Sequence, residues 1–592
     1  MPLRRANRNE RTRLARSSRP RDRIGALNSF TRVLASFAMV VIVGGVLFLQ
    51  AAPAPQSPIR FSFQAIPFRL ENDETPLRHV PAAMAGGVAI LDYNKDGRPD
   101  IFFTNGANLA TLKKDLPKYS NRLFRNDGHG VFTDVTKEAG LAGTGYDFGV
   151  AVGDYDNDGY PDIFVAGLHR NTLYHNNKDG TFTDVTAKAG LDRPDTEYGP
   201  LWSIAAVWVD VNNDGLLDLF IVNYLQWNYE NEPRCEYADV VQYCHPRSYK
   251  GLPNQLFLNN GDGTFTDVSA QSGIRAHIGK GMGVGMADYD LDGKQDLFVT
   301  NDGYYNFLFH NLGGGKFEEN AFQTGVALVD IGDFISGMGL DFRDFDNDGY
   351  PDIAFVALNN ETFPLFENTG KGSFVEITAK SGMTKASRPM AGFGAGLYDF
   401  DNDGWKDLFV TRGHVDAVPA QHEEIEQYNT VFRNPGFSSA SSANAGAMGQ
   451  WLPLTEEAGL NAFPPARHRG VAFGDLDGDG RIDVVTTALG KDAEIWMNRS
   501  PNSGHWLDVA LEGTRSNRDG IGALVKVVTK TGTQYNHMTT SVGYASSSDG
   551  PVHFGLGPDA IVDTIEIHWP SGTVQRLEHV AADRVLNVKE PR

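Results

Sequence analysis

The stretch DYDNDGYPD, residues 154–162, places four aspartates within nine positions and returns at residues 344–352 as DFDNDGYPD. The same pattern occurs seven times along the chain, with oxygen-bearing side chains at positions 1, 3, 5 and 9 and glycine always at position 6. Alternate side chains of a tight loop converge on one point, and the glycine permits the sharp turn that brings them together. The repeated stretch therefore predicts cation-binding loops.

Calcium is the cation that this pattern favours, because Ca²⁺ accepts many oxygen ligands in a flexible geometry, whereas Mg²⁺ requires a strict octahedron. We expect up to seven structural Ca²⁺ ions, and metal-free Asp-rich turns are the alternative. Asparagine at position 3 of the first and third copies lowers their charge and predicts weaker binding there. The predicted ligands are the side chains at positions 1, 3, 5 and 9 and the backbone carbonyl at position 7: Asp92, Asn94, Asp96, Arg98, Asp100; Asp154, Asp156, Asp158, Tyr160, Asp162; Asp210, Asn212, Asp214, Leu216, Asp218; Asp288, Asp290, Asp292, Lys294, Asp296; Asp344, Asp346, Asp348, Tyr350, Asp352; Asp399, Asp401, Asp403, Trp405, Asp407; Asp475, Asp477, Asp479, Arg481, Asp483.

Each acidic copy continues into apolar sequence such as DIFVAG, which is typical of a strand and not of the second helix of an EF-hand. A second element then follows in phase, as in LFRNDGHGVFTDV from residue 123, where Asn and Gly between two apolar runs indicate a β-hairpin. Seven four-stranded units predict an all-β fold, a seven-bladed β-propeller over residues 61–500. The seventh unit lacks an outer strand, which FSFQAIPF, residues 61–68, is expected to supply; an open solenoid is the alternative.

The charge distribution agrees with cation binding. The chain carries a net charge of −21, but residues 1–50 contain ten arginines and only two acidic residues, so the remainder carries −29. The seven loops contain 26 carboxylates, which is nearly all of that excess. Phosphate contacts need a basic surface, so the acidic body excludes nucleic acid as the expected partner.

The N-terminus predicts export. An Arg-rich cytoplasmic leader, residues 1–32, precedes a run without charge at residues 33–49. Such a segment, taken as residues 33–50, is either a transmembrane signal anchor or a cleaved signal peptide. Residues 51–60 form a linker. The propeller is expected outside the cytoplasm, held on the membrane through residues 33–49 if the segment stays uncleaved and secreted if it is cut.

The longest connection between an acidic loop and the next strand lies in the third unit and contains both cysteines of the chain. In an exported protein Cys235 and Cys244 are expected to form a disulfide, with two free thiols as the alternative. Strand order places this insertion on the face opposite the acidic loops. Its aromatic residues suit a glycan or protein ligand, although a loop that packs its own aromatic side chains is the alternative. The candidate ligand-face residues are Trp227, Tyr229, Tyr237, Tyr243 and His245.

The C-terminal segment, residues 503–590, alternates in short apolar runs and predicts a small β-domain. The acidic loops resemble the FG-GAP (VCBS) repeats of integrin α-subunit propellers. TRSNRDGIGALVKV, residues 514–527, and IHWPSG, residues 567–572, are similar to the ASPIC/UnbV domain. The combination resembles the cartilage acidic protein family and its bacterial relatives. This resemblance implies an extracellular, calcium-binding protein and implies no reaction.

Three functions are compatible with these features. An exported calcium-binding propeller that acts as a cell-surface or extracellular binding or adhesion module explains both the loops and the aromatic insertion. A carbohydrate-active enzyme, a polysaccharide lyase or hydrolase working on the insertion face, is the alternative, but the sequence contains no nucleophile elbow, phosphate loop or zinc-protease motif. A purely structural envelope protein leaves the insertion unexplained. The sequence therefore favours binding over catalysis.

Overall fold

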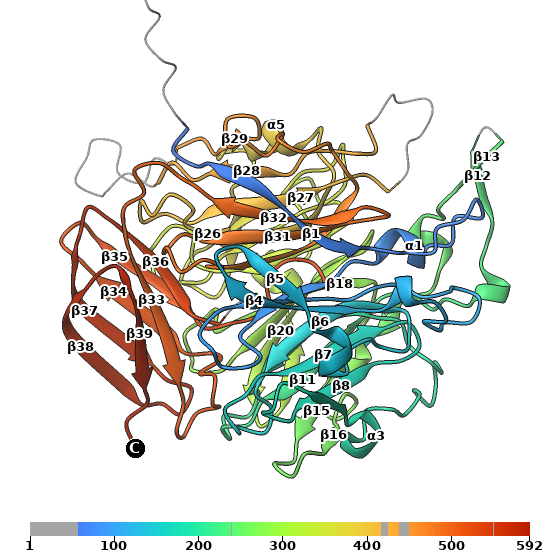
Figure 1. Ribbon diagram of the computed structural model, residues 1–592, viewed down its shortest axis with the longest axis horizontal. Helices are drawn as coiled ribbons and strands as arrows, with labels where there is room; N and C mark the ends of the chain where they lie inside the picture. The colour runs from blue at the N-terminus through green and yellow to red at the C-terminus, as the bar shows by residue number, and fades with distance from the viewer. Residues whose placement is uncertain (1–56, 238, 416–423, 437–448, 549) are drawn as a thin grey trace, which may run out of the picture. The chain divides into compact units, whose positions relative to one another are not determined.

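The computed structural model describes residues 57–592 except 238, 416–423, 437–448 and 549 (Figure 1). The leader, the segment at residues 33–50 and most of the linker lie outside these residues, so the predictions about them stay predictions. Across the described residues, no helix is both long and apolar enough to span a membrane. The helices there are short: α1 (Pro81–Met84), α2 (Thr136–Ala139), α3 (Thr186–Ala189), α4 (Ala321–Thr324), α5 (Met383–Ser387), and the 3-10 turns η1 (Pro117–Tyr119), η2 (Tyr229–Asn231), η3 (Pro246–Ser248) and η4 (Ile274–Ala276).

Strands dominate, and the predicted all-β class is confirmed. Seven four-stranded antiparallel sheets follow one another along residues 61–498, and we call them blades 1 to 7. The strands of each blade are given from the innermost to the outermost. Blade 1 contains β2 (Val88–Leu91), β3 (Asp100–Phe103), β4 (Arg122–Gly128) and β5 (Val131–Asp134); blade 2 contains β6 (Asp147–Gly153), β7 (Asp162–Gly167), β8 (Thr172–Asn176) and β9 (Phe182–Asp184); blade 3 contains β10 (Ser203–Val209), β11 (Asp218–Asn223), β15 (Gln255–Asn259) and β16 (Phe265–Asp267); blade 4 contains β18 (Gly281–Ala287), β19 (Asp296–Asn301), β20 (Phe307–Gly313) and β21 (Lys316–Glu319). Blade 5 contains β22 (Leu340–Phe342), β23 (Ile353–Phe355), β24 (Leu365–Asn368) and β25 (Phe374–Glu376); blade 6 contains β26 (Gly392–Tyr398), β27 (Asp407–Arg412), β28 (Thr430–Arg433) and β29 (Leu452–Leu454); blade 7 contains β30 (His468–Gly474), β31 (Asp483–Ala488), β32 (Asp492–Asn498) and β1 (Phe61–Arg69).

The N-terminal strand joins the last blade. β1 pairs antiparallel with β32, with Phe61 opposite Asn498, and the two strands run side by side in Figure 1. The innermost strands contact their neighbours in the order β2, β6, β10, β18, β22, β26 and β30, and β30 in turn contacts β2. The spare strand expected at residues 61–68 therefore supplies the outer strand that the seventh unit lacks.

Small residues allow the inner strands to approach closely. A Cβ atom on Gly149 of β6 would lie 2.2 Å from the carbonyl oxygen of Ile204 in β10, and one on Gly283 of β18 would lie 2.7 Å from that of Met338. Real Cβ atoms do not come so near, so a larger residue would push neighbouring blades apart. The glycine-rich first strand of the sequence repeat is thus a packing requirement.

The C-terminal domain consists of two sheets. One contains β36 (Val552–Gly557), β33 (His505–Glu512) and β39 (Arg584–Lys589), with β33 and β39 parallel; the other contains β35 (Thr533–His537), β34 (Leu524–Val528), β37 (Ile561–His568) and β38 (Val574–Ala581). A turn at Asn517–Ile521 precedes β34, with Gly520 at φ +67° and its N–H donating to the Asn517 carbonyl at 3.0 Å. This turn falls within the NRDGIGA motif.

The connection between β35 and β36 extends from this domain into the centre of the propeller. Residues 538–548 are almost entirely buried and form hydrogen bonds with the inner strands of several blades. These bonds include Ser547 N to Val88 O at 3.0 Å, Val150 N to Ala545 O at 3.1 Å, Ser541 Oγ to Val284 O at 2.9 Å, Gly543 N to Leu340 O at 3.2 Å, and Phe473 N to Ser548 Oγ at 3.2 Å. Because these strands line the propeller axis, the segment, which we call the axial segment, occupies that axis.

Candidate metal loops and the insertion face

Each acidic loop joins the first and second strands of its blade through two residues in the left-handed region. In blade 2 these are Asn157, at φ +58°, and Gly159, at φ +94°. The glycine at position 6 was expected to adopt this conformation; the left-handed residue at position 4 was not. Position 4 has positive φ in all seven loops: Lys95, Asn157, Asn213, Leu291, Asn347, Asn402 and Gly478.

Backbone hydrogen bonds hold the carboxylates in place. In blade 2 Asp154 accepts the N–H groups of Asp158 at 2.9 Å and Gly159 at 2.6 Å, while Asp158 accepts that of Tyr160 at 3.0 Å. Carboxylate oxygens of Asp154, Asp156 and Asp158 all lie within 4.8 Å of one another. The same grouping recurs in blade 4 at Asp288, Asp290 and Asp292 and in blade 5 at Asp344, Asp346 and Asp348. The structure thus brings together the predicted side chains at positions 1, 3 and 5.

Burial makes these carboxylates unfavourable as bare anions. Burial, followed by the charge of nearby Asp519, raises the pKa of Asp154 to about 8, and burial also raises the pKa of Asp162 to about 7. Asp162 is 1% exposed, and its Oδ2 has no hydrogen-bond partner. Buried charges without a counter-charge are strongly destabilising. An oxygen-rich, buried donor set of this kind fits a divalent cation.

An asparagine on the third strand fastens each loop to the preceding blade. The backbone N–H of Asn368 donates to the position 9 carboxylate of Asp352 at 2.8 Å, and its Nδ2 donates to the carbonyls of Pro351 at 3.0 Å and of Tyr289 in blade 4 at 2.8 Å. The same three bonds occur in every blade, and Asn126 of blade 1 reaches Leu476 of blade 7. These latch asparagines are Asn126, Asn176, Asn259, Asn311, Asn368, Asn434 and Asn498.

The latch was missed because the asparagine was interpreted only as a turn residue. Its sequence signal is its presence in all seven hairpins, two positions after the last residue of the third strand's apolar pair. A hairpin turn alone tolerates several residue types, so an unvarying asparagine indicates a side chain with a fixed set of partners. The buried Nδ2 position explains why no other residue replaces it in this chain.

Charged side chains beside the loops distinguish one blade from another. Arg433 contacts Asp403 and lies 2.9 Å from Asp401 in blade 6, and Arg499 lies 2.8 Å from Asp477 in blade 7. Blade 5 instead places the half-buried Glu367 at the position that Arg433 occupies in blade 6. Sequence reasoning counted only the charges within each loop and therefore distinguished only the first and third loops, which have asparagine at position 3.

The C-terminal domain contacts the loop face of the propeller. Asp519 accepts the N–H of Asp154 at 2.7 Å, and the N–H of Arg518 donates to Asn157 at 2.7 Å. The Lys406 ammonium bridges the carbonyls of Asp344 and Tyr535. This domain therefore covers part of the loop face.

The opposite face carries the cysteine-containing insertion of blade 3. Its strands β12 (Cys235–Tyr237) and β13 (Val240–Gln242) form a hairpin that a Cys235–Cys244 disulfide closes, as predicted. Trp227, 4% exposed, and Tyr243 are buried, which matches the self-packed alternative for these two residues. Tyr229, Tyr237 and His245 are exposed.

The insertion is fastened to the chain segment before blade 1. Glu232 accepts the N–H of Val80 at 2.9 Å and lies 2.5 Å from the imidazole of His79. Trp227 packs edge-on against Trp202, with ring centroids 6.5 Å apart. The hairpin thus stands on a buried aromatic base and presents its tip to solvent.

Fold and loops together define a β-propeller assembled from acidic-loop repeats. The model of the FG-GAP-like repeat matches residues 92–165, 154–221, 238–299, 288–355 and 344–410, about half of the chain, and the model named ASPIC and UnbV matches residues 513–592. The chain therefore belongs to the FG-GAP-like repeat family and ends in an ASPIC and UnbV domain.

Curated relatives align with most of this chain. Cartilage acidic protein 1 of Xenopus tropicalis is 26% identical over 517 residues, covering 83% of this chain and 71% of the relative. The human protein of the same name is 25% identical over 531 residues, covering 86% and 73%. The resemblance noted from the sequence is thereby confirmed.

Solved structures are more distant. A lectin from Agrocybe aegerita, described as recognising non-reducing terminal N-acetylglucosamine, is 14% identical, with a TM-score of 0.38 over 69% of this chain and 86% of the lectin. YCF48 bound to a D1 peptide is 8% identical, with a TM-score of 0.38 over 76% of this chain and 99% of that one.

Proposed function

We propose that this protein is an exported, calcium-stabilised binding module whose insertion face holds a glycan or a protein ligand. The observation that carries the calcium assignment is the convergence of loop carboxylates beside the buried aspartates at positions 1 and 9, best developed in blade 5. There Asp344, Asp346 and Asp348 converge within 4.8 Å, and the position 9 residue Asp352 is fully buried. Burial and the neighbouring carboxylates raise the pKa of Asp346 to about 8.

Calcium would supply the charge that these carboxylates lack. Side chains at positions 1, 3, 5 and 9 and the carbonyl at position 7, which is Tyr350 in blade 5, would hold the ion. Every one of these donors is an oxygen atom, which is the ligand that Ca²⁺ takes in proteins. The loops hold neighbouring blades together through the latch asparagines, so the role assigned to calcium is structural.

Export agrees with two observations. The disulfide between Cys235 and Cys244 is a bond that persists in oxidising compartments. The similarity to cartilage acidic protein 1 supports an extracellular binding module.

The ligand is assigned to the exposed side of the disulfide hairpin. Tyr237 is 51% exposed and Tyr229 is 38% exposed, and the ring of Tyr229 packs edge-on against the buried Trp227. Exposed aromatic rings on a rigid frame give contact area at little entropic cost, which suits sugar rings and protein hot spots alike. We place the contact at Tyr229 and Tyr237 and assign Trp227 and Tyr243 to the frame.

A glycan array run with the full chain in calcium and again in EDTA tests this assignment. A glycan hit that disappears in the Tyr229→Ala/Tyr237→Ala variant locates the ligand on the hairpin. Val375→Ala, an equally exposed change on β25 of blade 5, is the matched control and should keep the hit. A silent array with folded protein would remove the glycan half of the proposal.

A thermal melt of the same preparations tests calcium separately. Chelation should lower the melting temperature, and added calcium should restore it. A melt that does not change in EDTA would overturn the calcium assignment without affecting the ligand face.

A further inference from the structure

The residue before each latch asparagine occupies the same position in every blade but differs in chemistry from blade to blade; in blades 2, 4 and 6 it contacts the carboxylates of the acidic loop. All seven blades have the same strand pairing with different residues at this position. The fold therefore does not require one residue type here, and the residue can change the charge and the ligand atoms beside the loop. Two blades place a histidine there. The seven residues are Arg125, His175, Leu258, His310, Glu367, Arg433 and Met497.

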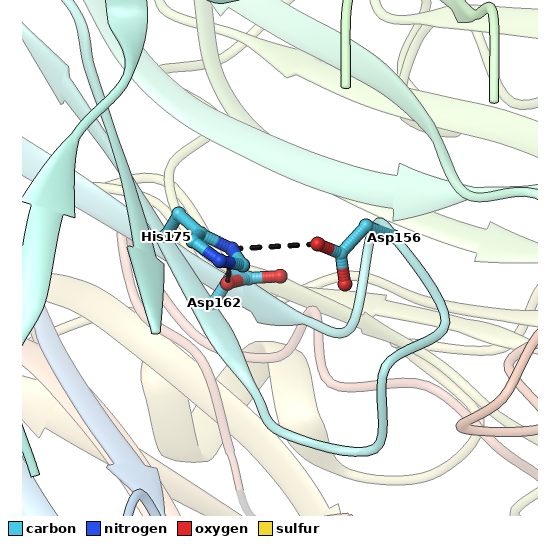
Figure 2. A group of neighbouring side chains, drawn as sticks. All are labelled: Asp156, Asp162 and His175. Atoms are coloured by element: carbon cyan, nitrogen blue, oxygen red, sulfur yellow. Dashed lines mark ion pairs between the residues drawn. The ribbon is translucent and has the colours of Figure 1, made fainter. Parts of the chain in front are cut away.

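Blade 2 brings its histidine close to two loop carboxylates. The Nδ1 atom of His175 lies 3.2 Å from Oδ1 of Asp162 and 3.4 Å from Oδ2 of Asp156. Figure 2 shows the imidazole of His175, on β8, directed toward Asp156 of the loop and toward Asp162, the first residue of β7, with an ion pair drawn to each. The sequence-based prediction considered only oxygen atoms as loop ligands and did not include this nitrogen.

Two of these polar groups are buried without a hydrogen-bond partner. Oδ2 of Asp162 and Nδ1 of His175 both lack one, and Asp162 is 1% exposed. The other oxygen of Asp162 accepts the N–H of Asn176 at 2.8 Å, which fixes the carboxylate in place. Buried polar atoms are almost always paired, so the buried Oδ2 of Asp162 points to a ligand position beside the His175 imidazole.

We propose that the blade 2 loop binds a first-row divalent transition metal, with zinc as the reference ion, through Asp156, Asp162 and His175 in place of calcium. Imidazole nitrogen is a ligand of zinc and its neighbours, whereas calcium takes oxygen. Ligand atoms about 2.1 Å from a tetrahedral metal lie about 3.4 Å apart, which agrees with the 3.2 Å and 3.4 Å separations of His175 Nδ1 from the two carboxylates.

Blade 4 contains the same group of two aspartates and one histidine, but in a geometry less suited to binding a metal. Asp290, Asp296 and His310 also group within 4.8 Å. However, His310 Nδ1 already forms a hydrogen bond with Asp296 at 3.1 Å and lies 3.9 Å from Asp290. The first equivalent of metal is therefore assigned to blade 2. This inference does not depend on calcium in the other blades, because it rests on an imidazole donor that only blades 2 and 4 place before the latch asparagine.

Equilibrium dialysis of the chelator-stripped full chain against Zn²⁺, in a large excess of Ca²⁺, tests the proposal, with bound metals counted by mass spectrometry. The wild-type chain should retain zinc, and His175→Gln should lose one zinc per chain. His175→Leu is a second variant that is compatible with the fold, since Leu258 occupies the same position in blade 3. Leu258→Gln is the matched control and should leave the zinc count unchanged.

Cobalt provides an independent readout. Co²⁺ bound to the wild-type chain should give a visible absorption band that is lost in His175→Leu and kept in Leu258→Gln. A zinc count and a cobalt spectrum that His175→Leu leaves unchanged would overturn the proposal and assign His175 as a salt-bridging imidazolium only. Displacement of all zinc by calcium would overturn it as well. A zinc result in either direction leaves the EDTA melt of the calcium assignment unaffected.

Discussion

Blades 5 and 6 share the loop start DFDNDG, yet the residues that face these loops have opposite charges. In blade 5 the half-buried Glu367 adds a carboxylate beside Asp346. In blade 6 the guanidinium of Arg433 contacts Asp401 and Asp403. One residue outside the loop therefore decides how the loop's negative charge is balanced. With Glu367 the loop needs a bound cation, and with Arg433 the protein supplies the positive charge itself.

This difference separates the metal-binding part of the repeat from its structural part. Both blades keep the latch asparagine, the left-handed residues at positions 4 and 6, and the buried aspartate at position 9. These features fix the backbone and the contact with the preceding blade. The residue before the latch asparagine changes only the charge that surrounds the loop.

The largest expected effect comes from removing the feature that both blades share. Asn368→Ala leaves the carbonyls of Pro351 and Tyr289 without their donor and creates a cavity between blades 4 and 5. Each loss of a buried partner costs about 1–3 kcal/mol, so we expect a loss of about 3 kcal/mol in unfolding free energy by denaturant titration. Asn434→Ala in blade 6 should cost about the same.

Equal losses in the two blades would establish that the latch acts independently of the loop's charge. Lys371→Ala, on the exposed hairpin tip beside Asn368, is the control and should change stability by less than about 0.5 kcal/mol. A loss in blade 5 that calcium fully restores would contradict the independence of the two parts.

The second prediction concerns a substitution that makes the charge around the blade 6 loop more like that around the blade 5 loop. Arg433→Met removes the guanidinium and leaves two loop carboxylates without a partner; methionine already occupies this position in blade 7 as Met497. Removing one member of such a pair should lower stability in EDTA by about 1–2 kcal/mol. Calcium should restore it, and the apparent calcium affinity of the chain should rise about tenfold.

Calcium titration by calorimetry and thermal melts in calcium and EDTA would measure both effects. Arg576→Met, which breaks an exposed pair with Glu578 on the C-terminal domain, is the control. A variant that is equally stable with and without calcium would mean that Arg433 does not act as the loop's counter-charge.

Sequence reasoning succeeded wherever a local pattern has one structural solution. Glycine at position 6 is required by its left-handed conformation, and alternating apolar runs are required by strands that bury their faces. Seven repetitions of one pattern also fixed the all-β class and the pairing partner of β1. The first two inferences used residues that are near one another in the chain, and the pairing of β1 with β32 followed from counting the strands of each repeat.

The rest of the site depends on contacts between distant residues. Asp519 reaches Asp154, and the axial segment reaches inner strands of blades 1, 4, 5 and 7, without any local sequence signal for those contacts. The side chains beside the loops were accessible in principle, because aligning the seven hairpins places His175, Glu367 and Arg433 in one column. The function of this alignment position became clear only from the structure, which places these side chains next to the loop carboxylates.

A third, smaller effect is expected from the carboxylate that blade 5 adds. Glu367→Gln keeps the shape of the side chain and removes its charge, so calcium binding to blade 5 should weaken about fivefold. Calorimetric titration should show that the calcium site with the highest affinity, which we assign to blade 5, binds calcium more weakly in this variant. Glu318→Gln, an exposed change on β21 of blade 4, is the control; an unchanged tightest site would place the strongest calcium ligand set in another blade.

The smallest effect extends the comparison to the other face, where the charges of the two blades are again opposite. Burial raises the pKa of Glu361 in blade 5 to about 7 and lowers that of Arg412 in blade 6 to about 10. Glu361 accepts the N–H groups of Ser336 at 3.1 Å and Leu358 at 3.0 Å, which a glutamine oxygen would accept equally well.

Because the folded pKa of Glu361 lies above the ordinary value of 4.5, its protonated form stabilises the fold at low pH. That contribution is lost as the pH rises from about 5 through about 7. Glu361→Gln should therefore gain about 1 kcal/mol over the wild type at pH 8 and nothing at pH 4.5, as measured by denaturant titration at both values. Glu456→Gln, which is exposed, should show no such difference. A gain at both pH values would mean that packing, and not ionisation, limits this side of blade 5, and the charge contrast with blade 6 would then be confined to the loop face.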